Sequence, residues 1–244
     1  MNIDTRKIVR IISLIVLIAS LCVLAVYIIG DLRDAKVDGD INDLKNNEVK
    51  VPDVLNEYAG LYAENGDTIG WLKIDGTDID YVVMQAPDEI DKYLHRDFYG
   101  KDSYRGCLFV DEYCDIFNSD NLIVYGHNMK DGSMFGTLDS YADEGFCAEH
   151  KKIRFDTIYE KHTYEVVAAI KTNIPAKDEK CFRYYEYTSS NDEETFLEYM
   201  DFIEKNRLYD TGVEIQPGDK LLTLSTCAYH TANGRFVVVA KQVS

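Results

Sequence analysis

The sequence predicts a mainly β domain of eight strands, a barrel or a sandwich, that follows a membrane-spanning helix. Three observations lead to this prediction. Short segments rich in Val, Ile, Leu, Tyr and Phe recur between turn signals from Trp71 onward, which is typical of all-β domains rather than of βαβ units. Residues 11–30 carry no charged side chain. Helical patterns are confined to three segments that interrupt the strands.

The N-terminal segment has the length and composition of a transmembrane helix. Residues 11–30 read IISLIVLIASLCVLAVYIIG, and twenty residues at about 1.5 Å each span the roughly 30 Å hydrocarbon layer. Basic residues precede this segment and Asp31 follows it, so the positive-inside rule predicts a cytoplasmic N-terminus. We expect four parts: a cytoplasmic N-terminus (1–10), a transmembrane signal-anchor (11–30), a stalk, linker or surface helix (31–50) and an extracellular domain (51–244).

Two other interpretations of the apolar segment remain. A cleaved signal peptide normally has an apolar region of about 7–15 residues that ends at a small-x-small site, whereas YIIGDLRDA offers no clean site. The third possibility is a buried helix of a soluble protein. The uncleaved anchor fits the length best.

Eight strands are expected in the external domain, with boundary errors of about two to four residues. The strands are GWLKI (70–74), DYVVM (80–84), GCLFV (106–110), NLIVY (121–125), KIRFD (152–156), TYEVVAAIK (163–171), KLLTLST (220–226) and RFVVVAK (235–241).

Helix-spaced apolar residues predict a helix over 51–65, before the first strand, and an acidic helix over 191–205, before the strand that leads to Cys227. Ser190 or Asn191 can cap the second helix, and its acidic first turn favours the helix dipole. A shorter turn is expected near residues 134–141.

Composition excludes several classes of function. Twenty-six Lys and Arg against 43 Asp and Glu give a net charge of −17, which would repel a phosphate backbone, so no nucleic-acid partner is expected. Five of the six cysteines lie outside the apolar segment, so at least one cannot pair within the chain. Cys107, inside GCLFV, is expected to be a buried apolar side chain. No cysteine pair has CxxC spacing, and neither a metal nor a cofactor is expected.

Three reactive side chains lie at the ends of predicted strands. Cys227 ends LLTLST, His127 directly follows NLIVYG, and Arg235 opens the strand that begins eight residues after Cys227. A thiolate can attack a carbonyl, an imidazole can hold the thiolate as an ion pair and protonate the leaving amine, and a guanidinium can stabilise the oxyanion or clamp substrate carbonyls. The set predicts nucleophilic acyl transfer, although Cys227 alone would more often be a packing residue.

The other histidines compete with His127. His230 lies three residues beyond Cys227 and is the strongest rival. His150 and His162 lie in charged turns and are expected at the surface, and His95 has no role that can be assigned.

The chain resembles class B sortases, the membrane-anchored cysteine transpeptidases of Gram-positive bacteria. TLSTC at 223–227 is similar to the TLxTC signature of sortases, YGHNMKDGSMFG (125–136) to the class B histidine segment, and RFVVVAK carries the family arginine. Further similarity lies in residues 65–85, in YLHRDF (93–98) and in the acidic helix, so the resemblance covers roughly residue 51 to the C-terminus. It narrows the fold to a sortase-type eight-stranded β-barrel with an N-terminal helix and a helix before the cysteine strand.

The resemblance implies residue roles and partners. Cys227 would be the nucleophile, His127 the acid/base, Arg235 the oxyanion or substrate clamp, and Ser225 and Thr226 substrate-binding positions. Ser225 is equally well explained as a strand-end hydroxyl that bonds the backbone. The implied partners are surface proteins with a C-terminal sorting motif, NPxTx or [SP]PxTG, cleaved after threonine, and the amine of the peptidoglycan precursor lipid II that resolves the thioester.

One departure from the family pattern stands beside the nucleophile, and two other functions remain open. Many class B members carry an acidic residue after the cysteine, where this chain has Ala228. The alternatives are a membrane-anchored cysteine peptidase that only hydrolyses and a non-catalytic surface receptor domain.

Overall fold

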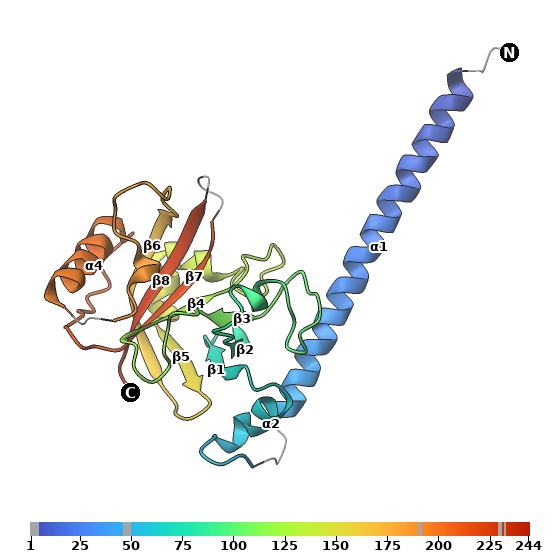
Figure 1. Ribbon diagram of the computed structural model, residues 1–244. Coiled ribbons are helices and arrows are strands. Elements are labelled where there is room, and N and C mark those ends of the chain that lie inside the picture. The colour runs from blue at the N-terminus through green and yellow to red at the C-terminus, as the bar shows by residue number, and fades with distance from the viewer. Residues whose placement is uncertain (1–4, 46–49, 190–191, 229–230, 232) are drawn as a thin grey trace.

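The computed structural model describes residues 5–45, 50–189, 192–228, 231 and 233–244, and they form a closed β-barrel on a long helix (Figure 1). Around the barrel the strand order is β1-β2-β3-β4-β7-β8-β6-β5. The eight strands confirm the predicted barrel: β1 (Thr68–Lys73), β2 (Asp80–Met84), β3 (Leu108–Val110), β4 (Asn121–Tyr125), β5 (Lys152–Thr157), β6 (Thr163–Asn173), β7 (Leu221–Cys227) and β8 (Gly234–Gln242).

Two of the strand pairs are parallel, β2 with β3 and β4 with β7, and the others are antiparallel. The barrel closes where β1 pairs with β5, at Gly70 opposite Thr157. A Cβ atom on Gly70 would lie 2.3 Å from the backbone oxygen of Asp156. Closure at this point therefore requires a residue without a side chain.

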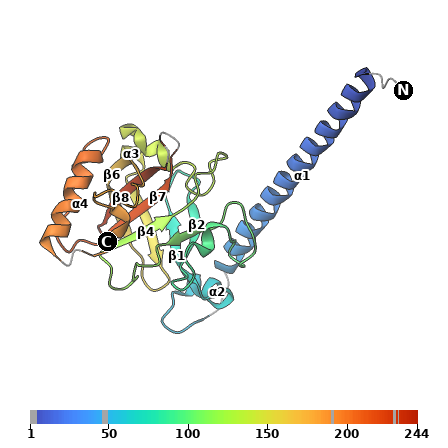
Figure 2. The ribbon, with the colours of Figure 1, turned by 45° about the horizontal axis from the view of Figure 1, so that its top comes forward.

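Alternation along the strands fills the barrel and covers its outer face. Leu222, Leu224, Phe236 and Val238 belong to the core inside the barrel, whereas their neighbours in the same strands point outward. The outward side chains of β6 and β8 pack against α4 (Glu193–Asn206) and the 3₁₀-helix η3 (Tyr184–Glu186). Figure 2 shows α4 on this side of the barrel and α1 on the opposite side.

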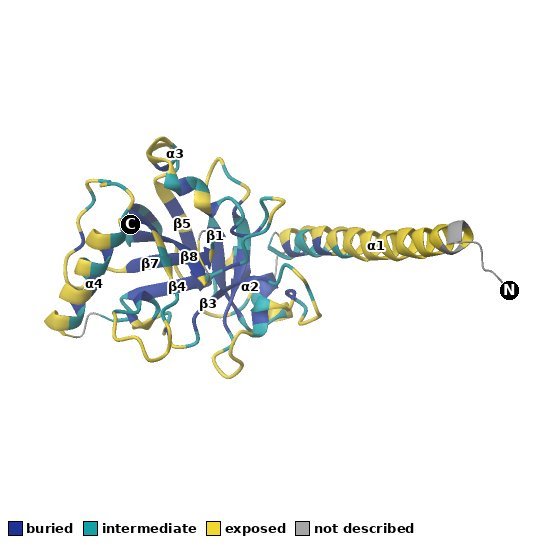
Figure 3. Ribbon diagram, turned by 90° about the horizontal axis from the view of Figure 1, so that it is seen from above, coloured by how far each residue is buried: buried dark blue, intermediate teal, exposed yellow. Residues whose placement is uncertain are grey.

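The long helix α1 (Thr5–Lys45) has two different parts. Its N-terminal part is apolar and exposed, and a stretch from Val9 is long and apolar enough to cross a membrane. Its C-terminal part packs on the domain (Figure 3), where Ile41 is 5% exposed. Ile41 joins α2 (Asn56–Glu64), Trp71 and Phe98 in a separate apolar cluster, and Lys45 Nζ lies 3.6 Å from the centre of the Trp71 ring.

The segment predicted as a stalk, linker or surface helix is thus helical through Lys45. Its polar contacts with the domain begin at Arg33, which donates to a buried Asp97 at 2.7 Å, rather than near Val51. The helical turns that follow residue 31 are therefore part of the folded unit.

The other helices differ from prediction in ways that local chemistry explains. The helix predicted from residue 51 begins at Asn56, because Pro52 and a left-handed Asp53 (φ 62°) interrupt it. Helix α4 begins after Asp192, whose carboxylate accepts from Thr195 N at 2.7 Å. The predicted caps Ser190 and Asn191 lie outside the described residues.

Short helical segments also follow β4. The predicted turn near residues 134–141 contains the 3₁₀-helix η2 (Leu138–Ala142). Helix α3 (Glu144–Glu149) was not predicted, since six residues are too short to show an apolar stripe. His150 and His162, expected at the surface, are half-buried.

The docked end of α1 makes a prediction about stability. Ile41→Ala should lower the free energy of unfolding by about 2–4 kcal/mol, because it removes a buried side chain and leaves a cavity. Lys36→Ala, on the exposed side of the same helix, should change it by less than about 0.5 kcal/mol. Urea unfolding of the full chain in detergent, followed by Trp71 fluorescence, measures both, and equal midpoints would contradict the docking.

Candidate active site

The parallel pairing of β4 with β7 brings His127 beside Cys227. Tyr125 pairs with Ser225 at the end of the ladder, so the residues two positions further along both strands leave the barrel together. Two side-chain hydrogen bonds extend the pairing past the end of β4. Thr226 Oγ1 donates to Gly126 O at 2.7 Å, and Asn128 Nδ2 donates to Cys227 O at 2.8 Å.

Arg235 reaches the same place from the other side of β7. Cys227 and Arg235 are register partners in the antiparallel β7–β8 pair, and directly paired residues project on the same face of a sheet. Arg235 Nη1 donates to Gly234 O at 3.0 Å. The structure therefore brings together the three residues predicted from strand ends.

These side chains lie on the outer face of the barrel, not in its interior. Cys227 and Arg235 continue the outward alternation of Thr223, Ser225 and Val237. A cleft of about 800 Å³ opens there, and its walls combine aromatic and aliphatic side chains with several carboxylates. The wall residues include Leu94, Phe109, Tyr113, Tyr125, Tyr184 and Tyr185.

The environment of His127 favours its neutral form. Burial lowers the pKa of His127, and the nearby His95 ring, 5.4 Å away between centroids, lowers it further. The Nε2 atom lies 2.8 Å from the carbonyl oxygen of Leu94, and this hydrogen bond opposes the lowering. Because a carbonyl can only accept, Nε2 carries the proton and Nδ1 of the neutral ring is the free base.

Both hydroxyls predicted to bind substrate line the cleft and already have partners. Ser225 is 1% exposed, and its Oγ lies 2.8 Å from the hydroxyl of Tyr184. Burial raises the pKa of Tyr184 to about 12, so the phenol stays protonated. Thr226 is also buried, and its hydroxyl holds the backbone of Gly126, the residue before His127.

Exposure separates Cys227 from most of the other thiols of the domain. Cys107, Cys114 and Cys147 are buried, and burial raises the pKa of each thiol, that of Cys114 to about 12. Cys181 and Cys227 are exposed, and only Cys227 lines this cleft. Within the described part of the chain, no cluster of three or more His, Cys, Asp or Glu side chains is arranged to hold a metal. His230 lies outside that part.

Three contributions to the site were not predicted from the sequence. The Leu94 carbonyl bonds His127 and the Asn128 amide bonds the backbone of Cys227. Both contacts depend on how the chain folds, so the residue types alone do not predict them. Tyr184 belongs to the tyrosine-rich segment CFRYYEY, whose composition was a usable signal for a cleft wall.

A comparison with protein families identifies the chain. Residues 72–243 match the sortase domain model. The chain belongs to the sortase family. Its sequence is 33% identical over 191 residues to sortase B of Staphylococcus aureus, covering 77% of this chain and 75% of that protein, and 32% identical over 195 residues to sortase B of Listeria monocytogenes, covering 79% and 76%.

Solved structures agree with this assignment. Sortase B of Bacillus anthracis, in complex with AAEK1, superposes with a TM-score of 0.75 at 32% identity, covering 89% of this chain and 99% of that one. The chain is thus a class B sortase, and this class consists of cysteine transpeptidases. The closed barrel, the long N-terminal helix and the helix before the cysteine strand agree with the predicted sortase fold.

The environment of His127 in this sortase predicts its titration. In the folded protein, the midpoint for His127 should lie below the 6.5 of a free imidazole, because burial and His95 both disfavour the cation. His95→Gln should move the midpoint upward by removing one of these causes. NMR of ¹⁵N-histidine-labelled protein measures both, and a wild-type midpoint above 6.5 would contradict the prediction.

Proposed function

We propose that Cys227 is the nucleophile of a sorting reaction that cleaves a C-terminal peptide motif after threonine and transfers the new acyl end to an amine. One observation carries the proposal: the β4–β7 and β7–β8 registers gather Cys227, His127 and Arg235 at the mouth of a single cleft. The exposed thiol has the aromatic and aliphatic side chains of that cleft beside it for a peptide to lie against.

His127 acts as base and then as acid. Its neutral ring takes the thiol proton at Nδ1 as the sulfur bonds to the threonine carbonyl carbon. The peptide C–N bond then breaks, the leaving amine receives that proton, and the threonine carbonyl remains as a thioester on Cys227. The amine of the acceptor attacks the thioester and gives up a proton to His127, the C–S bond breaks, and the departing thiolate takes that proton back from His127.

Arg235 stabilises the negative charge that develops on the carbonyl oxygen. It lies across the ladder from Cys227 at the start of β8. A guanidinium offers parallel donors to an oxyanion or to substrate carbonyls and keeps its charge at every working pH. Ser225 and Thr226 support the site from beneath, with Ser225 close enough to the cleft to contact a bound peptide.

Membership of the sortase family supports a proposal about the partners. A sortase B of Staphylococcus aureus, 28% identical to this chain, has been solved as a substrate complex, which supports a peptide substrate here. We infer that the substrates are surface proteins with an NPxTx or [SP]PxTG motif and that the acceptor is the amine of lipid II. The apolar part of α1 then anchors the chain with its N-terminus in the cytoplasm and the catalytic domain outside the cell.

The product distinguishes transfer from hydrolysis. A sorting peptide incubated with the full chain and an added amine should yield the amide, whereas a peptidase that only hydrolyses would yield the acid. A non-catalytic receptor domain would release no product at all. Mass spectrometry of the threonine-containing fragment separates the three outcomes.

Cys227→Ala should abolish both the thioester and turnover, because no second thiol lines the described cleft. Cys181→Ala is the matched control, since Cys181 is also exposed but lies elsewhere. Intact-protein mass spectrometry after incubation with a sorting peptide should show the acyl adduct in wild type and Cys181→Ala only. An adduct on Cys227→Ala would assign the chemistry to another residue.

Arg235→Lys should fail nearly as badly as Arg235→Ala, although it keeps the charge. Loss of one oxyanion donor typically costs about 10²–10³ in turnover, and lysine supplies a point charge without two parallel donors. Turnover of one sorting peptide by both variants, with melting temperatures as the check on folding, is the measurement. If the turnover of Arg235→Lys lay within about threefold of wild type, the paired donors of the guanidinium would not be needed for catalysis.

A further inference from the structure

The apolar and docked parts of α1 form one unbroken helix. Residues 11–30 carry no charge, and helical hydrogen bonding continues through Asp31 to Lys45. A helix that spans a bilayer and continues into the folded domain leaves no flexible linker between the two. The distance between the domain and the lipid is therefore set by the contacts that residues 31–45 of α1 make with the barrel domain.

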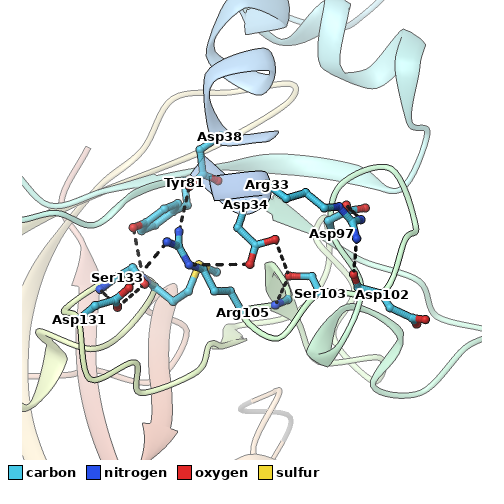
Figure 4. Close-up of polar contacts among 12 residues, drawn as sticks. Arg33, Asp34, Asp38, Tyr81, Asp97, Asp102, Ser103, Arg105, Asp131 and Ser133 are labelled. Atoms are coloured by element: carbon cyan, nitrogen blue, oxygen red, sulfur yellow. Dashed lines mark hydrogen bonds and ion pairs between the residues drawn. The ribbon is translucent and has the colours of Figure 1, made fainter. Parts of the chain in front are cut away.

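These contacts form a polar clamp between α1 and the segment 97–105 (Figure 4). Arg33 bonds the carboxylate of Asp97 at 2.7 Å and the carbonyl of Asp102 at 3.0 Å. Ser103 Oγ lies 3.3 Å from Asp34, and Arg105 lies 3.4 Å from Asp38 and 3.9 Å from Asp34. The clamp holds this loop against the helix immediately above the apolar segment.

The loop also extends toward the apolar segment itself. The ring of Tyr104 meets the ring of Tyr27 edge to face, with centroids 6.2 Å apart. Tyr27 lies within the uncharged run, about 6 Å along the helix from Asp31. Trp and Tyr are enriched at this depth, the boundary between headgroups and acyl chains, because their rings are apolar and carry a polar tip.

We propose that the segment 97–105 is a membrane-contact surface, with Tyr104 inserted at the outer lipid interface beside Tyr27. Tyr104 is 69% exposed in the isolated chain and its ring lies against that of Tyr27. A bilayer that surrounds Tyr27 would therefore also cover the ring of Tyr104. This inference rests on the proposed anchor and adds a contact made by the catalytic domain.

The acidic charge of the chain indicates that the proposed contact depends on insertion of the Tyr104 ring and not on electrostatic attraction to the lipid. The chain carries a net charge of −17, so the anionic surface of a membrane repels the domain as a whole. The contact should therefore depend on the tether and on the aromatic ring, and only weakly on anionic lipid.

The contact would also orient the cleft. The end of the β7–β8 hairpin that bears Cys227 and Arg235 points to the same side as the N-terminal part of α1 in both Figure 1 and Figure 2. A domain held in this orientation presents its nucleophile toward the lipid surface, where a membrane-embedded acceptor amine arrives.

Depth-dependent fluorescence quenching tests the contact. The full chain, with Trp71 buried in every variant, is reconstituted into phosphatidylcholine vesicles brominated near the headgroup and, as a reference, into unbrominated vesicles. Tyr27→Trp reports the span and Tyr104→Trp the proposed contact. Phe117→Trp is the matched control: Phe117 is 65% exposed but precedes β4, at the opposite end of the barrel from Cys227.

The bromines should quench Tyr104→Trp at least about half as strongly as Tyr27→Trp, because both rings lie at the interface, and should leave Phe117→Trp at the level of wild type. Replacing a third of the lipid by phosphatidylglycerol should not change this pattern. If the bromines quenched Tyr27→Trp but not Tyr104→Trp, the membrane contact of the segment 97–105 would be wrong and the membrane anchor would still be supported. Quenching of neither would overturn the anchor as well, while cleavage of a sorting peptide would still report the proposed catalytic function.

Discussion

The parallel register between β4 and β7 is the constraint on which the site depends. It is fixed by side chains as well as by the ladder: Thr223 Oγ1 donates to Asn121 Oδ1 at 2.8 Å, and Asn121 Nδ2 donates to Tyr187 O at 2.8 Å. A slip of one residue would turn every side chain of one strand to the opposite face. These buried polar bonds therefore determine that His127 and Cys227 emerge side by side.

The same alternation explains why Cys227 is exposed at the end of the sheet. Along β7 and β8, outward side chains are covered by α4 and η3 until Ser225, which is 1% exposed and bonded to Tyr184. Two residues later the cover ends and Cys227 is exposed. The packed barrel supports β7 from the inside, α4 and η3 cover its outer face, and the Cys227 thiol lies where this cover ends and solvent begins.

The strands and the three reactive residues could be predicted from the sequence because both depend on local pattern: apolar runs of strand length, with Cys227, His127 and Arg235 at their ends. What could not be predicted depends on tertiary contact. The Leu94 carbonyl is presented by backbone geometry, and α3 is too short to show periodicity. The polar residues after Asp31 look like a stalk, since their clamp partners lie more than sixty residues away.

Arg105 connects α1 with the loop that follows His127. On one side it contacts Asp34 and Asp38 of α1, and on the other it lies 3.7 Å from Asp131 in the loop that follows His127. That loop is bonded to β7 through Asn128, and His127 is bonded to Leu94, just before the clamped segment 97–105. The long helix α1 and the segment that carries His127 are thus held by one set of loops. Because a guanidinium only 13% exposed and shared among three carboxylates is costly to leave unpaired, displacement of α1 would also disturb the support of the histidine loop.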